Sequence, residues 1–382
     1  MKIVIAPDSF KESLTSVEVA AEIEAGFREI LPDAEYVKVP IADGGEGTVE
    51  ALMAATGGRV LQQQVTGPLG EAVNACYGIT GDGKTAVIEM ASASGLALVP
   101  EEHRNPLLTT TFGTGELIRH ALDAGLRNFI IGIGGSATND AGVGMLQALG
   151  VRFLDGQNQE LGRGGGALSA LARIDCRSLD HRLSDCRILV ACDVNNPLTG
   201  PRGASRVFGP QKGATPAMVQ ELDANLSHFA HVVQRDLGQQ VDEVPGAGAA
   251  GGIGAAFLAF LDANLKPGIQ IVIDAVKLED AIIGAELVIT GEGRIDGQSM
   301  HGKAPVGVAR IALKHGVPVI GFAGSLGEGA EKVRECGISA LFSVVKGPCD
   351  LSEALTRAAE NLRSLARNVA AVIKLNSVSS SK

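Results

Sequence analysis

The sequence predicts an α/β protein that carries a largely parallel sheet and is divided into two domains. Short runs of β-branched residues alternate with longer segments whose apolar residues recur at a helical period. That alternation is typical of parallel sheets covered by helices. The chain has 382 residues, and at about 150 residues per domain this length favours two domains. Because 45% of the residues are apolar, a sizeable core is available.

The N-terminal elements are predicted in the order strand, helix, strand, helix. Residues 3–6 form the first strand, and the next helix begins at about Thr15, where Thr15 and Glu18 have the spacing of a capping box. Apolar residues line one face of this helix, and a Leu-Pro pair ends it. A second strand over residues 36–41 leads through the glycine-rich turn 43–47 into a second helix.

The middle of the chain changes character. Three strands joined by short turns are predicted as an antiparallel meander over residues 60–66, 73–79 and 85–90. An apolar strand over residues 129–133 is flanked by two helices near residues 115–124 and 140–149. A long helical pattern follows over residues 216–237.

The parallel type of strand returns near the C-terminus, over residues 286–290, 317–322 and 340–344. We therefore predict a discontinuous parallel-sheet domain of residues 1–57 plus 285–375, into which a mixed α/β domain of residues 58–284 is inserted. The polar residues 376–382 are predicted to form a frayed tail.

Charge and composition exclude several classes of function. The net charge of −10 argues against a nucleic-acid or anionic-membrane surface, since either needs a basic face. The six cysteines include no CxxC pair, and the N-terminus lacks the apolar segment of a signal peptide, so we expect a cytoplasmic protein with reduced thiols. The sequence contains neither HExxH nor GxSxG. The oligomeric state stays open, a homo-oligomer included.

Residues 78–85 match the phosphate-binding pattern GxxxxGK[ST], but their context differs from that of a P-loop. A P-loop opens a helix, whereas residues 86–90 read as a strand. Asp82-Gly83 is typical of a hairpin turn. We therefore predict that Lys84 belongs to a hairpin and binds no phosphate.

The glycine-rich turn at residues 132–137 supports three interpretations. It follows an apolar strand, is predicted to open a helix, and has Asp155 about 20 residues further on, as in the dinucleotide-binding fingerprint. Alternatively, the amides of Gly134, Gly135 and Ser136 could hold any phosphate, or the glycines could serve close helix packing. With 50 glycines in the chain, such patterns also arise by chance, which weakens the dinucleotide interpretation.

Acidic side chains follow four predicted strands, over residues 3–6, 36–41, 188–192 and 287–290. Ligands of parallel sheets gather at such strand ends. The acidic residues are Asp8, Asp43, Asp193 and Asp296. Each taken alone could be a cap, turn or loop residue. Together with cations near glycine-rich turns they provide what phosphoryl transfer needs, namely ligands for Mg²⁺, a base and positive charge for the phosphates. The cations are Lys11, Lys212 and Arg294.

Seven ordered segments of the chain resemble the bacterial glycerate kinase family. They are residues 2–14 (KIVIAPDSFKESL), 41–48 (IADGGEGT), 132–140 (GIGGSATND), 191–200 (ACDVNNPLTG), 208–214 (FGPQKGA), 245–252 (PGAGAAGG) and 288–296 (VITGEGRID). The resemblance extends from residue 1 to about residue 373. Within the family, the sequence is similar to the glycerate 2-kinases of glucarate, galactarate and glyoxylate metabolism. One departure is Ala141, where the family usually has glycine; we expect alanine to be tolerated there at the start of a helix.

The resemblance implies ATP-dependent phosphorylation of D-glycerate to 2-phosphoglycerate with Mg²⁺ in the cytoplasm. It also implies a Rossmann-like domain and a domain of a fold peculiar to the family, with the active site in the cleft between them. The implied catalytic residues are Asp193, Asp8, Lys11 and Asp296. The implied substrate- and phosphate-binding residues are Ser9, Gly134, Gly135, Ser136, Thr138, Asn139, Lys212 and Arg294. The implied metal ligands are Asp43, Asp140 and Asn195.

Two other classes of function remain as alternatives. One is an NAD(P)-dependent oxidoreductase that uses the turn at residues 132–137. The other is a non-catalytic protein that binds a phosphorylated metabolite through the same turns. Release of ADP on addition of glycerate separates the kinase from both.

Overall fold

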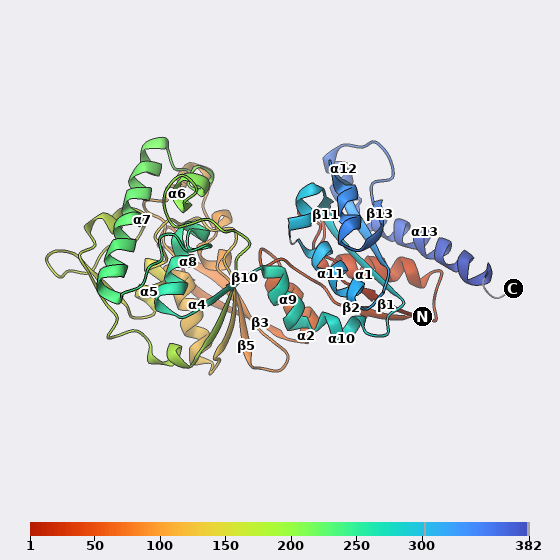
Figure 1. Cartoon of the computed structure of the whole chain (residues 1–382), viewed down its shortest axis with the longest axis horizontal. Coiled ribbons are helices and arrows are strands. Elements are labelled where there is room, and N and C mark those ends of the chain that lie inside the picture. The colour runs from red at the N-terminus through yellow and green to blue at the C-terminus, as the bar shows by residue number, and fades with distance from the viewer. Residues whose placement is uncertain (302, 380–382) are drawn as a thin grey trace. The chain divides into compact units, whose positions relative to one another are not determined.

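The structure is a computed structural model, and it describes residues 1–301 and 303–379. The chain divides into two compact units: unit 1 comprises Met1–Asp43, Glu50–Gly57 and Ile269–Lys382, and unit 2 comprises Gly44–Val49 and Gly58–Gly268. Unit 1 is therefore built from both ends of the chain, drawn in red and blue in Figure 1. The last segment of unit 1 begins at Ile269, ahead of the residue 285 expected from the sequence, because two helices precede the next strand.

Unit 1 contains a five-stranded sheet in the order β13-β12-β11-β1-β2, and its strand pairs are parallel. The strands are β1 (Lys2–Ile5), β2 (Glu35–Lys38), β11 (Leu287–Ile295), β12 (Val319–Leu326) and β13 (Ile338–Ser343). Strand β1 lies between β2 and β11, and its residues Ile3, Val4 and Ile5 are fully buried. A strand covered on both faces reads as a continuous apolar run, so the predicted parallel sheet is confirmed.

The longer helices of unit 1 are α1 (Ser16–Arg28), α9 (Gly268–Val276), α11 (Ala304–Lys314) and α13 (Ala358–Ser379), and the shorter ones are α10 (Leu278–Ile282) and α12 (Leu351–Thr356). Helix α2 (Thr48–Thr56) begins in unit 2 and continues in unit 1. Helix α1 begins with the predicted capping box: Glu18 N–H donates to Thr15 Oγ1 (3.3 Å), and Thr15 N–H donates to Glu18 Oε2 (2.8 Å).

Helices α1 and α13 lie side by side in unit 1 (Figure 1). The backbone of α13 remains helical to Ser379, so most of the predicted tail of residues 376–382 continues this helix. The reason is that an established helix adds one hydrogen bond with each further residue. Residues 380–382 lie outside the described residues.

Unit 2 contains a six-stranded mixed sheet in the order β10-β9-β6-β5-β4-β3. Its parallel part comprises β10 (Asn264–Lys266), β9 (Arg187–Ala191), β6 (Asn128–Gly132) and β5 (Thr85–Glu89). Strand β4 (Ala72–Ile79) pairs antiparallel with β5, and β3 (Arg59–Thr66) pairs antiparallel with β4, which confirms the predicted meander. A separate antiparallel pair consists of β7 (Arg152–Leu154) and β8 (Arg173–Asp175).

The helices of unit 2 surround this sheet with a large apolar core. They are α3 (Ala91–Ser94), α4 (Phe112–Asp123), α5 (Val143–Ala148), α6 (Ala204–Phe208), α7 (Pro216–Leu237) and α8 (Ala249–Phe260). Helix α7 has the predicted bounds, because Thr215 caps its first turn by accepting from Met218 N–H (3.3 Å) and Gly238 ends it in the left-handed conformation.

Candidate functional site

In unit 1, Asp8 lies just beyond the carboxyl end of β1. Its backbone N–H donates to Gly291 O on β11 (2.8 Å), and Ser9 N–H donates to the Asp8 carboxylate (2.6 Å). Strands β1 and β11 are neighbours, so Asp8 and Glu292 occupy the same edge of the sheet. The predicted gathering of acidic residues at strand ends therefore occurs within this unit.

The pKa of Asp8 is raised to about 7. Burial is the largest cause, and the negative charges of Asp43 and Glu292 raise the pKa further. The hydrogen bond from Ser9 N–H and the positive charge of Lys11 act in the opposite direction without cancelling the effect. The predicted residues Asp8, Ser9, Lys11 and Asp43 thus belong to one electrostatic group.

Glu292 is a member of this group that sequence reasoning missed. It is only 7% exposed, Ser299 Oγ donates to its carboxylate (2.6 Å), and Lys303 Nζ lies 3.6 Å from it. Burial raises the pKa of Glu292, although Ser299 and Lys303 counteract that rise. The signal was present, because Glu292 follows a buried apolar run just as Asp8 does. It was overlooked because the strand was expected to end at Thr290, whereas it continues to Ile295.

Arg294 and Asp296 bind each other in unit 1. The Arg294 Nε donates to Asp296 (3.1 Å), and Asp296 also accepts from Gln298 N–H (3.0 Å) in the following turn. The Arg294 side chain is 67% exposed. In this conformation Asp296 acts as a turn residue and ion-pair partner, which are the ordinary roles of an acidic loop residue.

In unit 2, the structure contradicts the predicted helix at the glycine-rich turn of residues 132–137. Strand β6 ends at Gly132, and helix α5 begins only at Val143. The amides of Gly134, Gly135 and Ser136 therefore do not lie at a helix N-terminus. Asp155 accepts from the amides of Gln157 and Gln159 in a turn beside β7. The strand–turn–helix context of a dinucleotide fingerprint is missing, so that interpretation is wrong.

Lys212 holds this turn from inside the protein. The side chain is 1% exposed, and its ammonium donates to Ser136 Oγ (2.6 Å) and Thr138 O (2.7 Å). Burial lowers the pKa of Lys212 to about 7, and the negative charge of Asp140 opposes that shift. The sequence suggested that Lys212 binds phosphate; in the structure its buried ammonium donates to Ser136 and Thr138.

Asp140 is also buried, at 1% exposure. Its carboxylate accepts from Thr111 N–H (2.9 Å), Thr111 Oγ1 (2.9 Å), Gly142 N–H (3.1 Å) and Gly144 N–H (3.3 Å). Burial raises its pKa and these hydrogen bonds oppose the rise. Because protein donors use both oxygens, the arrangement fits a structural carboxylate better than a metal ligand.

Ala141 does not start a helix. It is buried in the left-handed conformation, with φ +54°, and Gly142 follows with φ +72°. An L-residue in this region costs about 1–2 kcal/mol, which explains a preference for glycine there. The expectation of a helix start was wrong because the helix begins two residues later.

Thr138 and Asn139 lie behind the turn rather than on its surface, and both are fully buried. Asn139 Nδ2 donates to Ser205 Oγ (3.2 Å). The Thr138 hydroxyl has no hydrogen-bond partner within the described part of the chain. Neither side chain is accessible to a ligand in this conformation.

Asp193 follows β9, as expected, and is exposed. Its carboxylate accepts from Gly268 N–H (3.0 Å), at the first residue of α9. Asn195 is exposed two residues further along. Unit 2 thus presents an accessible carboxylate and an accessible amide at the carboxyl end of its parallel strands.

Lys84 lies in the turn between the antiparallel strands β4 and β5, which confirms the predicted hairpin. Asp82 accepts from both Thr80 Oγ1 (2.7 Å) and Lys84 N–H (3.0 Å) and so fixes the turn.

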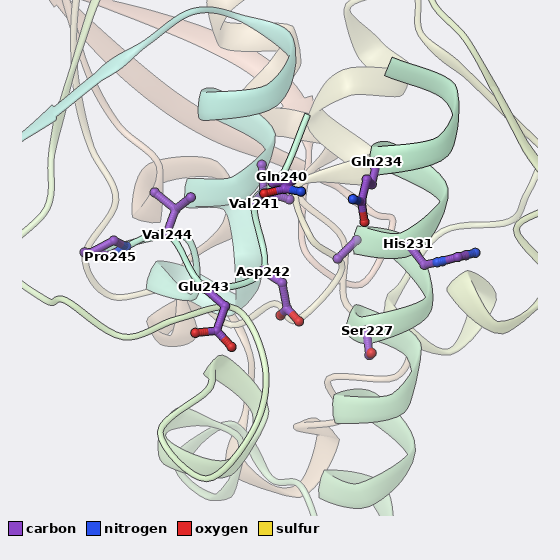
Figure 2. Close-up of a pocket in the computed structure, with 10 residues that line it drawn as sticks. Ser227, His231, Gln234, Gln240, Val241, Asp242, Glu243, Val244 and Pro245 are labelled. Carbon is purple, nitrogen blue, oxygen red and sulfur yellow. The ribbon is translucent and has the colours of Figure 1, made fainter. Parts of the chain in front are cut away.

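A cavity of about 560 Å³ lies between α7 and residues 240–245 in unit 2 (Figure 2). Figure 2 shows that His231 points away from Asp242 and Glu243. Asp242 accepts from Thr199 Oγ1 (2.6 Å). The residues that line this cavity include none of the predicted site residues.

The carboxylates of unit 1 would suit Mg²⁺ only together with ligands from outside the protein. Residues 1–301 and 303–379 contain no group of three or more His, Cys, Asp or Glu side chains arranged to hold a metal ion. Mg²⁺, however, is commonly held by one or two carboxylates together with water and substrate phosphates. The mutual repulsion of Asp8, Asp43 and Glu292 would be relieved by such a cation.

Within the described residues, no helix is long and apolar enough to cross a membrane.

Comparison with known proteins agrees with these features. The model of the glycerate kinase family matches residues 3–374. Glycerate 2-kinase of Escherichia coli (strain K12) is 61% identical over 375 residues, which is 98% of each chain. Glycerate kinase of Bacillus subtilis (strain 168) is 59% identical over 375 residues, again 98% of each chain. A crystal structure of a protein provisionally assigned as glycerate kinase 2 of Salmonella typhimurium LT2 has a TM-score of 0.91 and 59% identity, covering 99% of each chain.

Proposed function

The chain belongs to the glycerate kinase family, and from that premise we propose that it transfers the γ-phosphoryl group of ATP to the 2-hydroxyl of D-glycerate, giving 2-phosphoglycerate and ADP. The observation that carries this proposal is the similarity over residues 3–374, together with 61% identity to a glycerate 2-kinase. The oxidoreductase alternative has no support, because the turn at Gly134–Ser136 does not open a helix.

In this proposal Asp8 accepts the proton of the glycerate hydroxyl. A hydroxyl becomes a good nucleophile only as it loses its proton, and a base with a pKa near the working pH serves best. A pKa of about 7 suits Asp8 for that role. Ser9 N–H holds the carboxylate in place, and Lys11 keeps a positive charge near it.

Asp43 and Glu292 are proposed to hold Mg²⁺ together with the phosphates of ATP. The ion, when bound, neutralises charge on the β- and γ-phosphate oxygens. The buried Glu292 is kept in position by Ser299 and Lys303, so this carboxylate is in place before the ion binds. Arg294 is proposed to contact phosphate after exchanging its ion pair with Asp296 for the ligand.

Asp193 and Asn195 are proposed as the substrate contacts supplied by unit 2, together with the exposed turn at Gly134 and Gly135. All four are exposed. The backbone of glycines can approach a ligand closely, because no Cβ intervenes.

The proposal is tested with the purified chain, ATP, Mg²⁺ and D-glycerate, with products resolved by phosphorus NMR. We expect 2-phosphoglycerate to form and its signal to be absent when glycerate is omitted. A product phosphorylated at the 3-hydroxyl would contradict the assigned position. Absence of any phosphoglycerate from folded protein would contradict the function itself.

A further inference from the structure

The buried contact between Lys212 and Ser136 leaves one hydrogen unused. A lysine ammonium can only donate hydrogen bonds, whereas a serine hydroxyl can both donate and accept. Ser136 Oγ therefore accepts from Lys212 Nζ (2.6 Å) and retains its own hydrogen for donation. No described residue accepts that hydrogen.

The unused hydrogen lies next to an accessible surface. Ser136 is 6% exposed, and it follows Gly134 and Gly135, which are both exposed. The turn is held on its other side by two backbone hydrogen bonds, from Leu96 N–H to Gly135 O (2.8 Å) and from Ala137 N–H to Ser94 O (3.0 Å). The hydroxyl is thus fixed in position before any ligand binds.

We infer that Ser136 donates its hydroxyl hydrogen to an anionic oxygen of a substrate, and that Lys212 is the positioning residue that orients and polarises this hydroxyl. The inference rests on the proposed function, which supplies two anionic partners: the carboxylate of glycerate and the phosphates of ATP. At 1% exposure Lys212 acts through Ser136 and does not touch the ligand itself.

The physical basis is that a hydroxyl which accepts a hydrogen bond from a cation becomes a stronger donor. Such a chain of hydrogen bonds carries part of the lysine's charge to the ligand while the lysine remains in the core. The second bond of Lys212, to Thr138 O (2.7 Å), fixes the direction of its ammonium.

The test is a double-mutant cycle of Ser136→Ala, Lys212→Met and the double variant, with KM and kcat measured for both substrates. Loss of a hydrogen bond to a charged group should raise the KM of one substrate by about tenfold or more and leave kcat within a few-fold. Because both residues act through one contact, the KM of the double variant should rise no further than the KM of the more affected single variant. A raised KM for glycerate identifies its carboxylate as the acceptor of the hydrogen bond from Ser136, and a raised KM for ATP identifies a phosphate as the acceptor.

Two outcomes overturn the inference. The first is an unchanged KM for both substrates in Ser136→Ala. The second is full additivity in the double variant, because it means that Lys212 and Ser136 act on the ligand separately. Ser136→Ala decides the question alone if Lys212→Met does not fold, since it removes only one oxygen atom.

The matched control is Lys84→Met, which removes the same charge from an exposed hairpin turn. We expect unchanged KM values, so a general effect of net charge is separated from the contact with Ser136. Failure of the proposed function is distinguishable, because it appears in the unaltered chain as absence of phosphoglycerate. Failure of the inference appears only in the variants.

Discussion

At the scale of single residues, Asp8 links the chemistry of the chain to its stability. Its carboxyl has a pKa of about 7 in the folded protein, against an ordinary value of 3.8. The folded state therefore binds the proton more tightly than the unfolded chain does. The contribution of protonated Asp8 to the free energy of unfolding is fully present below pH 3.8. It is lost as the pH rises through about 7.

Asp8→Asn cannot ionise and should be more stable than the unaltered protein at pH 8, by about 1–3 kcal/mol in the free energy of unfolding. The same variant should lose about 10²–10⁴ in kcat, because a general base is removed. In the unaltered enzyme, kcat/KM should rise with pH and level off above about pH 7.

The change in stability is measured by urea unfolding at pH 5 and pH 8 without Mg²⁺ and nucleotide. The change in turnover is measured by a pH–rate profile. Asp33→Asn, at an exposed position of the same unit, serves as the control and should change neither. Near-native turnover in Asp8→Asn would remove Asp8 from the proposed mechanism.

At the scale of elements, the crossing of α1 and α13 depends on one glycine. A Cβ placed on Gly26 would lie 2.5 Å from Arg363 O and 2.7 Å from Ala366 Cβ. The backbone of α13 is a rigid neighbour, so the two helices would have to separate. Ala20, Ile23 and Leu362 are buried beside this contact and would lose packing.

We expect Gly26→Ala to lower the free energy of unfolding by about 1–3 kcal/mol, although alanine favours a helix by about 1 kcal/mol over glycine. Gly347→Ala is the matched control in the same unit, because nothing lies within 4 Å of its added Cβ. Equal stability of the two variants in urea unfolding would show that the helices do not require this close approach.

At the scale of the whole molecule, the two units have separate apolar cores. One core joins Ile3, Ile23, Phe27 and Leu362 in unit 1, and the other is built in unit 2 around residues such as Phe153 and Phe229. A compact unit with its own core can unfold as its own cooperative transition.

We therefore expect differential scanning calorimetry to give a calorimetric enthalpy larger than the van't Hoff enthalpy, as for two transitions. Gly26→Ala should lower the temperature of one transition only. A single transition with equal enthalpies, shifted as a whole by that variant, would contradict independent unfolding of the units.

Local patterns in the sequence are enough to predict the order of most elements and the parallel sheet. Periodicity, caps and turn residues are local, so the helix over Pro216–Leu237 and the hairpin at Lys84 could be predicted from short windows. The same local information also identified Asp8 and Asp193 as acids that follow strands.

Which of these side chains are exposed to solvent depends on contacts between distant segments and could not be predicted locally. The contact of Lys212 with Ser136 joins residues 76 positions apart, and the burial of Asp140 depends on Thr111 in another segment. The left-handed conformation of the buried Ala141 is likewise not indicated by the local sequence. The physical reason is that burial, and with it the pKa and accessibility of a group, is set by neighbours that the local sequence does not contain.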